Sequence, residues 1–103
     1  FIIYNLDEKK VQSKAFNLGL VQDLLHLLNI ETDDKIKFRL LFTLSTLLRN
    51  FPEAQMDFLQ HSGMDIMTKM IYQTKSNKKI KTRIIDLIND FIVEKVYDNA
   101  KIY

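Results

Sequence analysis

Apolar residues recur at intervals of three and four along almost the whole chain, which is the spacing of one buried face of an α-helix. Sequence stretches that alternate with a period of two, as half-buried strands do, are absent. The pattern therefore predicts an all-α protein. Four apolar faces stand out: Leu20, Val21, Leu24, Leu25, Leu27 and Leu28; Ile36, Leu40, Leu41, Leu44, Leu47 and Leu48; Met64, Met67, Met70 and Ile71; and Ile80, Ile84, Ile85, Ile88, Phe91 and Ile92.

Glycine, proline and short polar stretches divide this pattern into six helices. Pro52 suits the first turn of a helix, where its missing N–H has no cost. Gly63 is expected to take the left-handed conformation that commonly ends a helix. The predicted helices cover residues 7–17, 20–28, 35–50, 52–61, 64–74, and 79 to 96 or 97.

The long helices repeat at a fixed distance. A shift of 44 residues places the sequence KIKFRLL (35–41) on KIKTRII (79–85), and the same shift places Gly19 on Gly63. A three-helix unit of about 42–44 residues is typical of armadillo and HEAT repeats, whose units stack into one continuous core. The sequence therefore predicts an armadillo/HEAT-like α-α superhelix.

This period divides the chain, residues 1–103, into parts of one armadillo-like domain. Residues 5–50 and 51–97 are two repeats, residues 1–4 are the end of a preceding repeat, and residues 98–103 are a C-terminal extension. Two repeats are fewer than the roughly three that are usually needed for stability. We interpret the chain as a fragment of a longer array, and we expect its uncapped apolar ends to favour self-association or domain swapping.

Composition excludes several classes of function. The 103 residues include no cysteine and only two glycines, which leaves no thiolate metal site, no disulfide and no glycine-rich phosphate loop. The net charge of +2 is too small to drive nucleic-acid binding by itself. The chain contains no apolar run of about 18 residues, the length that spans a membrane. We therefore expect neither a nucleic-acid nor a membrane partner.

The histidines and the acidic residues form no catalytic or metal-binding pattern. His26 and His61 lack suitable ligands three or four residues away on the same helix face, and we interpret them as surface or capping residues. Glu31, Asp33 and Asp34 crowd one loop without the alternating oxygen ligands of a calcium loop. We expect Asp33 or Asp34 to be a helix N-cap. The sequence thus predicts no enzyme activity, no metal and no cofactor.

Basic side chains align between the two repeats but are not interleaved with aromatic residues, as single-stranded nucleic-acid grooves require. We interpret them as a solvated loop and helix start, although they could also contact phosphates or acidic partners. The aligned pairs are Lys35 with Lys79, Lys37 with Lys81, and Arg39 with Arg83, and Lys75 and Lys78 extend the cluster.

The exposed sides of the two long helices are the predicted partner surface, because the third helix of an armadillo unit lines the concave face. Removing the buried stripe leaves Phe38, Phe42, Ser45, Thr46 and Arg49 on one helix, and Thr82, Asp86, Asn89, Asp90 and Val93 on the other. We assign the partner contacts to Phe42, Ser45, Thr46, Arg49, Asn89 and Asp90. Two alternatives stay open. Phe38 and Phe42 could pack against a neighbouring repeat, and Arg49 could bond the carbonyls at the end of its own helix.

The segment from Leu47 to Met64 resembles a known family. It reads LLRNFPEAQ over residues 47–55 and continues through Phe58 and Leu59 to Ser62-Gly63-Met64. This is similar to the stretch LLRxFPxAQxxFLxxGGL of the Sil-type nucleotide exchange factors of the endoplasmic reticulum. Residues 86–96 resemble the segment LLYDLVTEKM of the same family.

The resemblance implies an armadillo-like co-chaperone of BiP, the lumenal heat-shock chaperone. Such a factor curls around one lobe of the nucleotide-binding domain and binds its opened form more tightly, so that ADP leaves faster. It also implies a location in the lumen of the endoplasmic reticulum. The alternatives are a cytosolic relative of the Fes or heat-shock-protein-binding type, and a generic armadillo scaffold for protein partners. The asparagine ladder typical of a peptide-binding scaffold is broken here, because Ser45 is the counterpart of Asn89.

Overall fold

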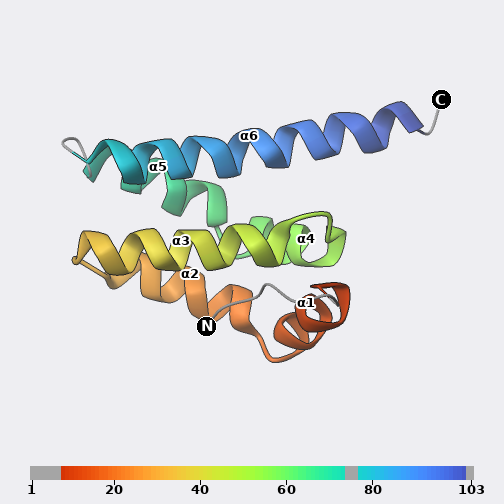
Figure 1. Cartoon of the computed structure of the whole chain (residues 1–103), viewed down its shortest axis with the longest axis horizontal. Helices are drawn as coiled ribbons and strands as arrows, with labels where there is room; N and C mark the ends of the chain where they lie inside the picture. The colour runs from red at the N-terminus through yellow and green to blue at the C-terminus, as the bar shows by residue number, and fades with distance from the viewer. Residues whose placement is uncertain (1–7, 74–76, 102–103) are drawn as a thin grey trace.

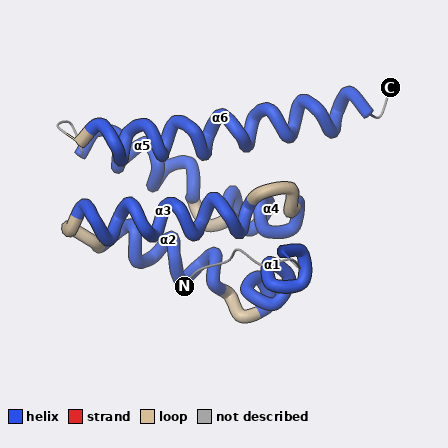
Figure 2. Tube along the Cα trace, in the orientation of Figure 1, coloured by secondary structure: helices blue, strands red, loops and turns tan. Residues whose placement is uncertain are grey.

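The computed structural model describes residues 8–73 and 77–101, and every regular element in these ranges is an α-helix (Figure 2). The predicted all-α fold is confirmed. The apolar residues 1–4, expected to end a preceding repeat, lie outside the described residues, as does Lys75. The helices are α1 (Glu8–Asn17), α2 (Leu20–Ile30), α3 (Asp34–Leu48), α4 (Pro52–Gln60), α5 (Gly63–Gln73) and α6 (Lys78–Lys101).

The helices form two stacked units of three, which we name repeat one (α1–α3) and repeat two (α4–α6). Figure 1 shows α3 and α6 side by side and running in the same direction, with α2 and α5 behind them. The short helices α1 and α4 lie toward the end of the molecule where α3 ends. This arrangement places the two long helices together on one side of the molecule.

Local sequence explains where the long helices begin. The Asp33 carboxylate accepts hydrogen bonds from the backbone N–H groups of Lys35 (2.8 Å) and Ile36 (3.4 Å), so the predicted N-cap is confirmed. The Asn77 side chain accepts one from the N–H of Ile80 at 3.1 Å, and caps α6 in the same way. These bonds satisfy donors that a helix start otherwise leaves free.

The turn between α4 and α5 differs from the prediction. Ser62, not Gly63, has the left-handed backbone, with φ of 62°, and it corresponds to Gly19, with φ of 77°. Gly63 already belongs to α5 and is buried. A Cβ atom at Gly63 would lie 2.6 Å from Cγ of the Phe58 ring, so glycine is required here for close packing.

The last helix is longer than expected. The prediction ended it at residue 96 or 97, but α6 continues to Lys101. Its counterpart α3 ends because Asn50 adopts a left-handed backbone, with φ of 53°, and Pro52 begins the next helix. Shifted by 44 residues, Asn50 and Pro52 fall on Glu94 and Val96, and neither of these residues stops a helix.

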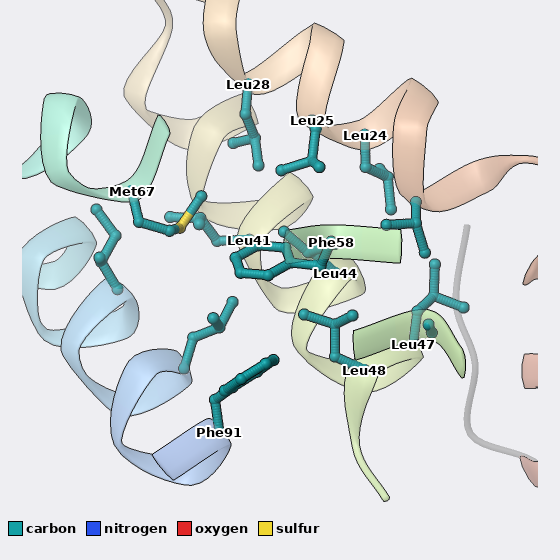
Figure 3. Packing of buried hydrophobic residues seen from close by; sticks show 14 of the residues in the cluster. Leu24, Leu25, Leu28, Leu41, Leu44, Leu47, Leu48, Phe58, Met67 and Phe91 are labelled. Carbon is teal, nitrogen blue, oxygen red and sulfur yellow. The ribbon is translucent and has the colours of Figure 1, made fainter. Parts of the chain in front are cut away.

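The core runs without a break through both repeats (Figure 3). Leucines of α2 and α3 meet Phe58 of α4 and Met67 of α5, and Phe91 of α6 lies 5.9 Å from Phe58 between ring centroids. Leu44 is fully buried, whereas its counterpart Ile88 is half-buried against the same core.

Some residues assigned to the buried faces are exposed instead. Leu27 and Ile36 of repeat one, and Ile85 and Ile92 of repeat two, each expose two-fifths or more of their surface. The periodicity identified the apolar face correctly but could not show how far the neighbouring repeat covers it.

We expect Gly63→Ala to lower the free energy of unfolding by about 1–3 kcal/mol, because the added methyl group overpacks the Phe58 ring in a filled core. Denaturant titration measures the change. The double variant Phe58→Leu/Gly63→Ala serves as the control, since the smaller side chain makes room for the methyl group. If the two substitutions simply add, the contact between Gly63 and Phe58 is not what limits this position.

Candidate partner-binding surface

A groove of about 670 Å³ lies between the first halves of α3 and α6. The hydrogen bond from the Asn77 amide to the Asp34 carboxylate, 2.8 Å long, joins the two repeats at its edge. The aromatic ring of Phe38 gives the groove an apolar part. Its lining consists of Asp34, Lys35, Phe38, Arg39, Asn77, Lys78, Lys79, Ile80, Thr82, Arg83 and Asp86.

The side chains that line the groove carry more net positive charge than the chain as a whole. Five cationic and two anionic side chains line it, whereas the entire chain has a net charge of +2. Four of the six aligned basic residues thus line the groove together: Lys35, Arg39, Lys79 and Arg83. The third pair does not line it, and Lys37 of that pair is buried. A concave surface with this charge has a positive electrostatic potential, which is complementary to carboxylates.

Phe42 and Arg83 connect the two repeats beside this groove. The Arg83 guanidinium lies 4.7 Å from the centroid of the Phe42 ring, which is the geometry of a cation-π contact. Phe42 therefore contacts the neighbouring repeat, yet half of its surface is still exposed. The Nε atom of Arg83 is buried and has no hydrogen-bond partner among the described residues.

Thr46 does not belong to the exposed surface, and its assignment as a partner contact is wrong. Only 8% of the residue is exposed, and its hydroxyl donates to the carbonyl of Phe42 on its own helix. Its carbonyl accepts a 2.7 Å hydrogen bond from the Gln12 side chain of α1. The packing of α1 against the end of α3 covers this position, which a single helix pattern does not reveal.

The other assigned residues lie toward the second halves of the long helices. Arg49, Ser45 and Asp90 line a small hollow of about 20 Å³, which has room for about one water molecule. Ser45 is half-buried and donates its hydroxyl proton to the carbonyl of Leu41. Asn89 is exposed and lines neither the groove nor this hollow.

The end of α3 is fixed by buried glutamines and not by the Arg49 side chain. The Nε2 atom of Gln12 donates to the carbonyls of Thr46 (2.7 Å) and Arg49 (2.9 Å). Gln55, at the corresponding place in repeat two, donates to the carbonyl of Leu48 at 2.9 Å. Carbonyls at a helix end need such partners, so these glutamines hold the point from which the exposed Arg49 side chain projects.

Other kinds of site find no support in the described residues. They contain no group of three or more His, Cys, Asp or Glu side chains placed to hold a metal ion. None of the described helices has the length and apolar content to cross a membrane. The ring Nδ1 of His61 lies 2.9 Å from the carbonyl and 3.0 Å from the carboxylate of Asp57, at the end of α4.

Residues 7–102 match the SIL1/FES1/HPBP1 C-terminal domain family. The chain belongs to this family. The match includes all six helices, so both repeats and the groove lie within the SIL1/FES1/HPBP1 domain.

The similar proteins carry one of two names, nucleotide exchange factor SIL1 or Hsp70-binding protein 1. The chain is 37% identical to nucleotide exchange factor SIL1 of Xenopus laevis over 84% of its length, and 38% identical to that of Rattus norvegicus over 85%. It is 25% identical to Hsp70-binding protein 1 of Homo sapiens over 73% of its length. The chain spans 19% of the length of these SIL1 relatives and 21% of Hsp70-binding protein 1. No solved structure matches the chain.

We expect Gln12→Leu to lower the free energy of unfolding by about 1–3 kcal/mol, because it leaves the carbonyls of Thr46 and Arg49 without their donor. Gln22→Leu is the matched control. Gln22 is exposed and makes a long 3.3 Å hydrogen bond to Asp57, so its loss should cost less than about 0.5 kcal/mol. Thermal or denaturant unfolding compares the two variants. Equal losses would contradict the role given to Gln12.

Proposed function

We propose that the protein is a nucleotide exchange factor that binds the nucleotide-binding domain of an Hsp70-type chaperone and accelerates the release of ADP. The observation that carries this proposal is the family match over residues 7–102, together with 37–38% identity to relatives named nucleotide exchange factor SIL1. The chain spans 19% of the length of those relatives, so their activity is assigned to it here as a proposal.

The proposed mechanism needs binding surfaces and no catalytic side chains. A protein that binds the opened chaperone lobe more tightly than the closed one shifts the population toward the opened form. Each tenfold preference corresponds to about 1.4 kcal/mol of differential binding free energy. ADP leaves faster from the opened form because it has lost contacts there. A preformed helical surface suits this task, since little of its binding energy is lost in ordering the protein.

We propose that the groove between α3 and α6 contacts an acidic part of the chaperone lobe. Its excess positive charge, which includes the guanidinium groups of Arg39 and Arg83, favours a surface that presents carboxylates. Phe38 and Phe42 supply exposed aromatic area beside these charges, a combination that is common at the centre of protein interfaces. Arg49, Ser45, Asn89 and Asp90 would then lie toward the second halves of the helices, at the edge of the contact.

We further propose that the chaperone is BiP in the lumen of the endoplasmic reticulum. The identity is higher to the SIL1 relatives than to Hsp70-binding protein 1, and the segment LLRNFPEAQ resembles the lumenal type. The competing possibility is a cytosolic Hsp70, supported by the weaker match to Hsp70-binding protein 1. A generic scaffold for extended peptides has less support, because Ser45 and Asn89 occupy matched positions and break the asparagine ladder.

The function is tested by following the release of a fluorescent ADP analogue from the nucleotide-binding domains of BiP and of a cytosolic Hsp70. We expect the protein to accelerate release from BiP, with less effect on the cytosolic domain. Because the groove is cationic, the acceleration should weaken as ionic strength rises. If neither domain releases ADP faster at saturating protein, the proposed function is wrong. If only the cytosolic domain responds, the compartment is wrong and the activity stands.

Substitution of two arginines tests whether the chaperone contacts the groove or the small hollow beside Arg49. We expect Arg39→Ala to weaken chaperone binding by about 1–3 kcal/mol if the groove is the centre of the contact. Arg49→Ala should have a similar effect only if the contact extends to the second half of α3. Both side chains are exposed, so the melting temperature should change little. Lys14→Ala, on the exposed surface of α1, is the control for a general loss of charge. An unchanged affinity for Arg39→Ala would remove the groove from the proposal.

A further inference from the structure

Arg83 of α6 is held by a contact that joins the two repeats. Its guanidinium carbon lies 4.7 Å from the centroid of the Phe42 ring on α3. Among the described residues the guanidinium has no other partner, because Arg83 forms no ion pair and donates no side-chain hydrogen bond, even from its buried Nε atom. Asp86 lines the groove three residues further along α6, but it does not pair with Arg83. The ring of Phe42 is therefore the described contact that fixes where this charge lies.

A second aromatic ring of α3 provides a comparison. Phe38 lies about one turn before Phe42, and it is 37% exposed where Phe42 is 50% exposed. Phe38 lines the groove, but among the described residues no arginine or lysine lies over its ring. The two rings are thus similar in type, helix and exposure, and they differ in whether they support a cation.

A guanidinium above an aromatic ring can still bind an anion, because its N–H groups lie in its own plane. The Nε atom of Arg83 is buried, so an acceptor would approach the two terminal Nη groups. These two groups match both oxygens of a carboxylate, provided that the guanidinium has the right direction. A side chain that is already held loses less freedom when it binds. The contact with Phe42 thus prepares Arg83 for a bidentate carboxylate.

We propose that Arg83 binds a carboxylate side chain of the chaperone through its two Nη groups, and that Phe42 is the positioning residue that orients it. This inference rests on the proposed contact between the groove and the chaperone, and it names the chemistry at one point of that contact. The other cationic side chains of the groove attract the carboxylate, and the oriented guanidinium binds it at a defined place. Phe42 acts through Arg83 in this arrangement, which differs from the direct partner contact expected from the sequence.

The orientation of Arg83 is tested in the chain alone, by the NMR resonance of its Nε–Hε group. The ring current of residue 42 should shift this resonance in the parent and in Phe42→Tyr, which keeps the ring. Phe42→Leu should lose the shift, because it keeps an apolar side chain without a ring. Phe38→Leu is the matched control and should retain the shift. If Phe42→Leu leaves the resonance unchanged, Phe42 does not hold Arg83 and the proposal is wrong.

The binding step is measured with two ligands. One is the chaperone nucleotide-binding domain whose ADP release the protein accelerates, and the other is a hexaglutamate peptide, which supplies carboxylates without a chaperone. Arg83→Lys should weaken the binding of both roughly three- to tenfold, because lysine keeps the charge but lacks the planar fork. Phe42→Leu should weaken both by a similar factor, and Phe42→Tyr should bind like the parent.

A double-mutant cycle separates positioning from direct contact. Phe42→Leu/Arg83→Lys should bind no more weakly than Arg83→Lys alone, because the ring acts through the arginine. The effects of Phe38→Leu and Arg83→Lys should instead multiply, since these two residues are not in contact. Phe42 is half-exposed and Arg83 is half-buried, so circular dichroism and the melting temperature should change little in all of these variants.

Three results in the binding measurements would overturn the proposal: Arg83→Lys binds both ligands as tightly as the parent, the losses of Phe42→Leu and Arg83→Lys multiply in the double variant, or Phe42→Tyr binds as weakly as Phe42→Leu. If a chaperone domain binds the parent and these variants equally, the proposed function stands and this inference is wrong. If hexaglutamate shows the expected coupling but neither chaperone domain binds the parent, the proposed function is wrong and the carboxylate site formed by Phe42 and Arg83 stands.

Discussion

The structure depends on the burial of α3 from several directions at once. It packs against α2 behind it and α6 beside it, and α1 and α4 also contact it. Leu41, Leu44 and Leu47 are essentially inaccessible as a result. These contacts cover the second half of α3 most fully, and the exposed side chains of α3 lie in its first half, from Asp34 to Phe42. The groove lies where this first half runs beside α6, so its position follows from how α3 is covered.

A helix covered in this way must end at a defined residue, or the next repeat could not stack on it. The end requires partners for buried carbonyls, and Gln12 and Gln55 supply them from the first helix of each repeat. The left-handed Asn50 then turns the chain and Pro52 restarts it as α4. In α6 no such residues follow, and the helix continues to Lys101. The buried glutamines therefore fix both the spacing of the repeats and the place where Arg49 leaves the helix.

The sequence predicted whatever depends on local spacing and failed where burial depends on a distant part of the chain. Helix periodicity, the cap at Asp33 and the start at Pro52 are local properties, and the structure confirms them. Thr46 was misassigned because the helix that covers it lies 34 residues away in the sequence, at Gln12. Gly63 was predicted to take a left-handed backbone, but glycine is needed there because the Phe58 ring leaves no room for a side chain. Backbone preferences do not reveal such a contact. The aligned basic residues could have predicted the groove. That step required the assumption that residues 44 apart become neighbours when the two repeats stack.

Repetition also explains why the two walls of the groove are not equivalent. Lys35 and Arg39 recur as Lys79 and Arg83, so stacking brings like charges together and makes the groove cationic. Aromatic positions near them do not repeat: Phe38, which lines the groove, and Phe42, which lies beside it, correspond to Thr82 and Asp86 on α6. One wall is therefore aromatic and the other polar. The repeated positions set the sign of charge that the groove attracts. The unrepeated ones give it two different sides, and in the proposed complex these positions would supply the contacts that depend on the partner's orientation and shape.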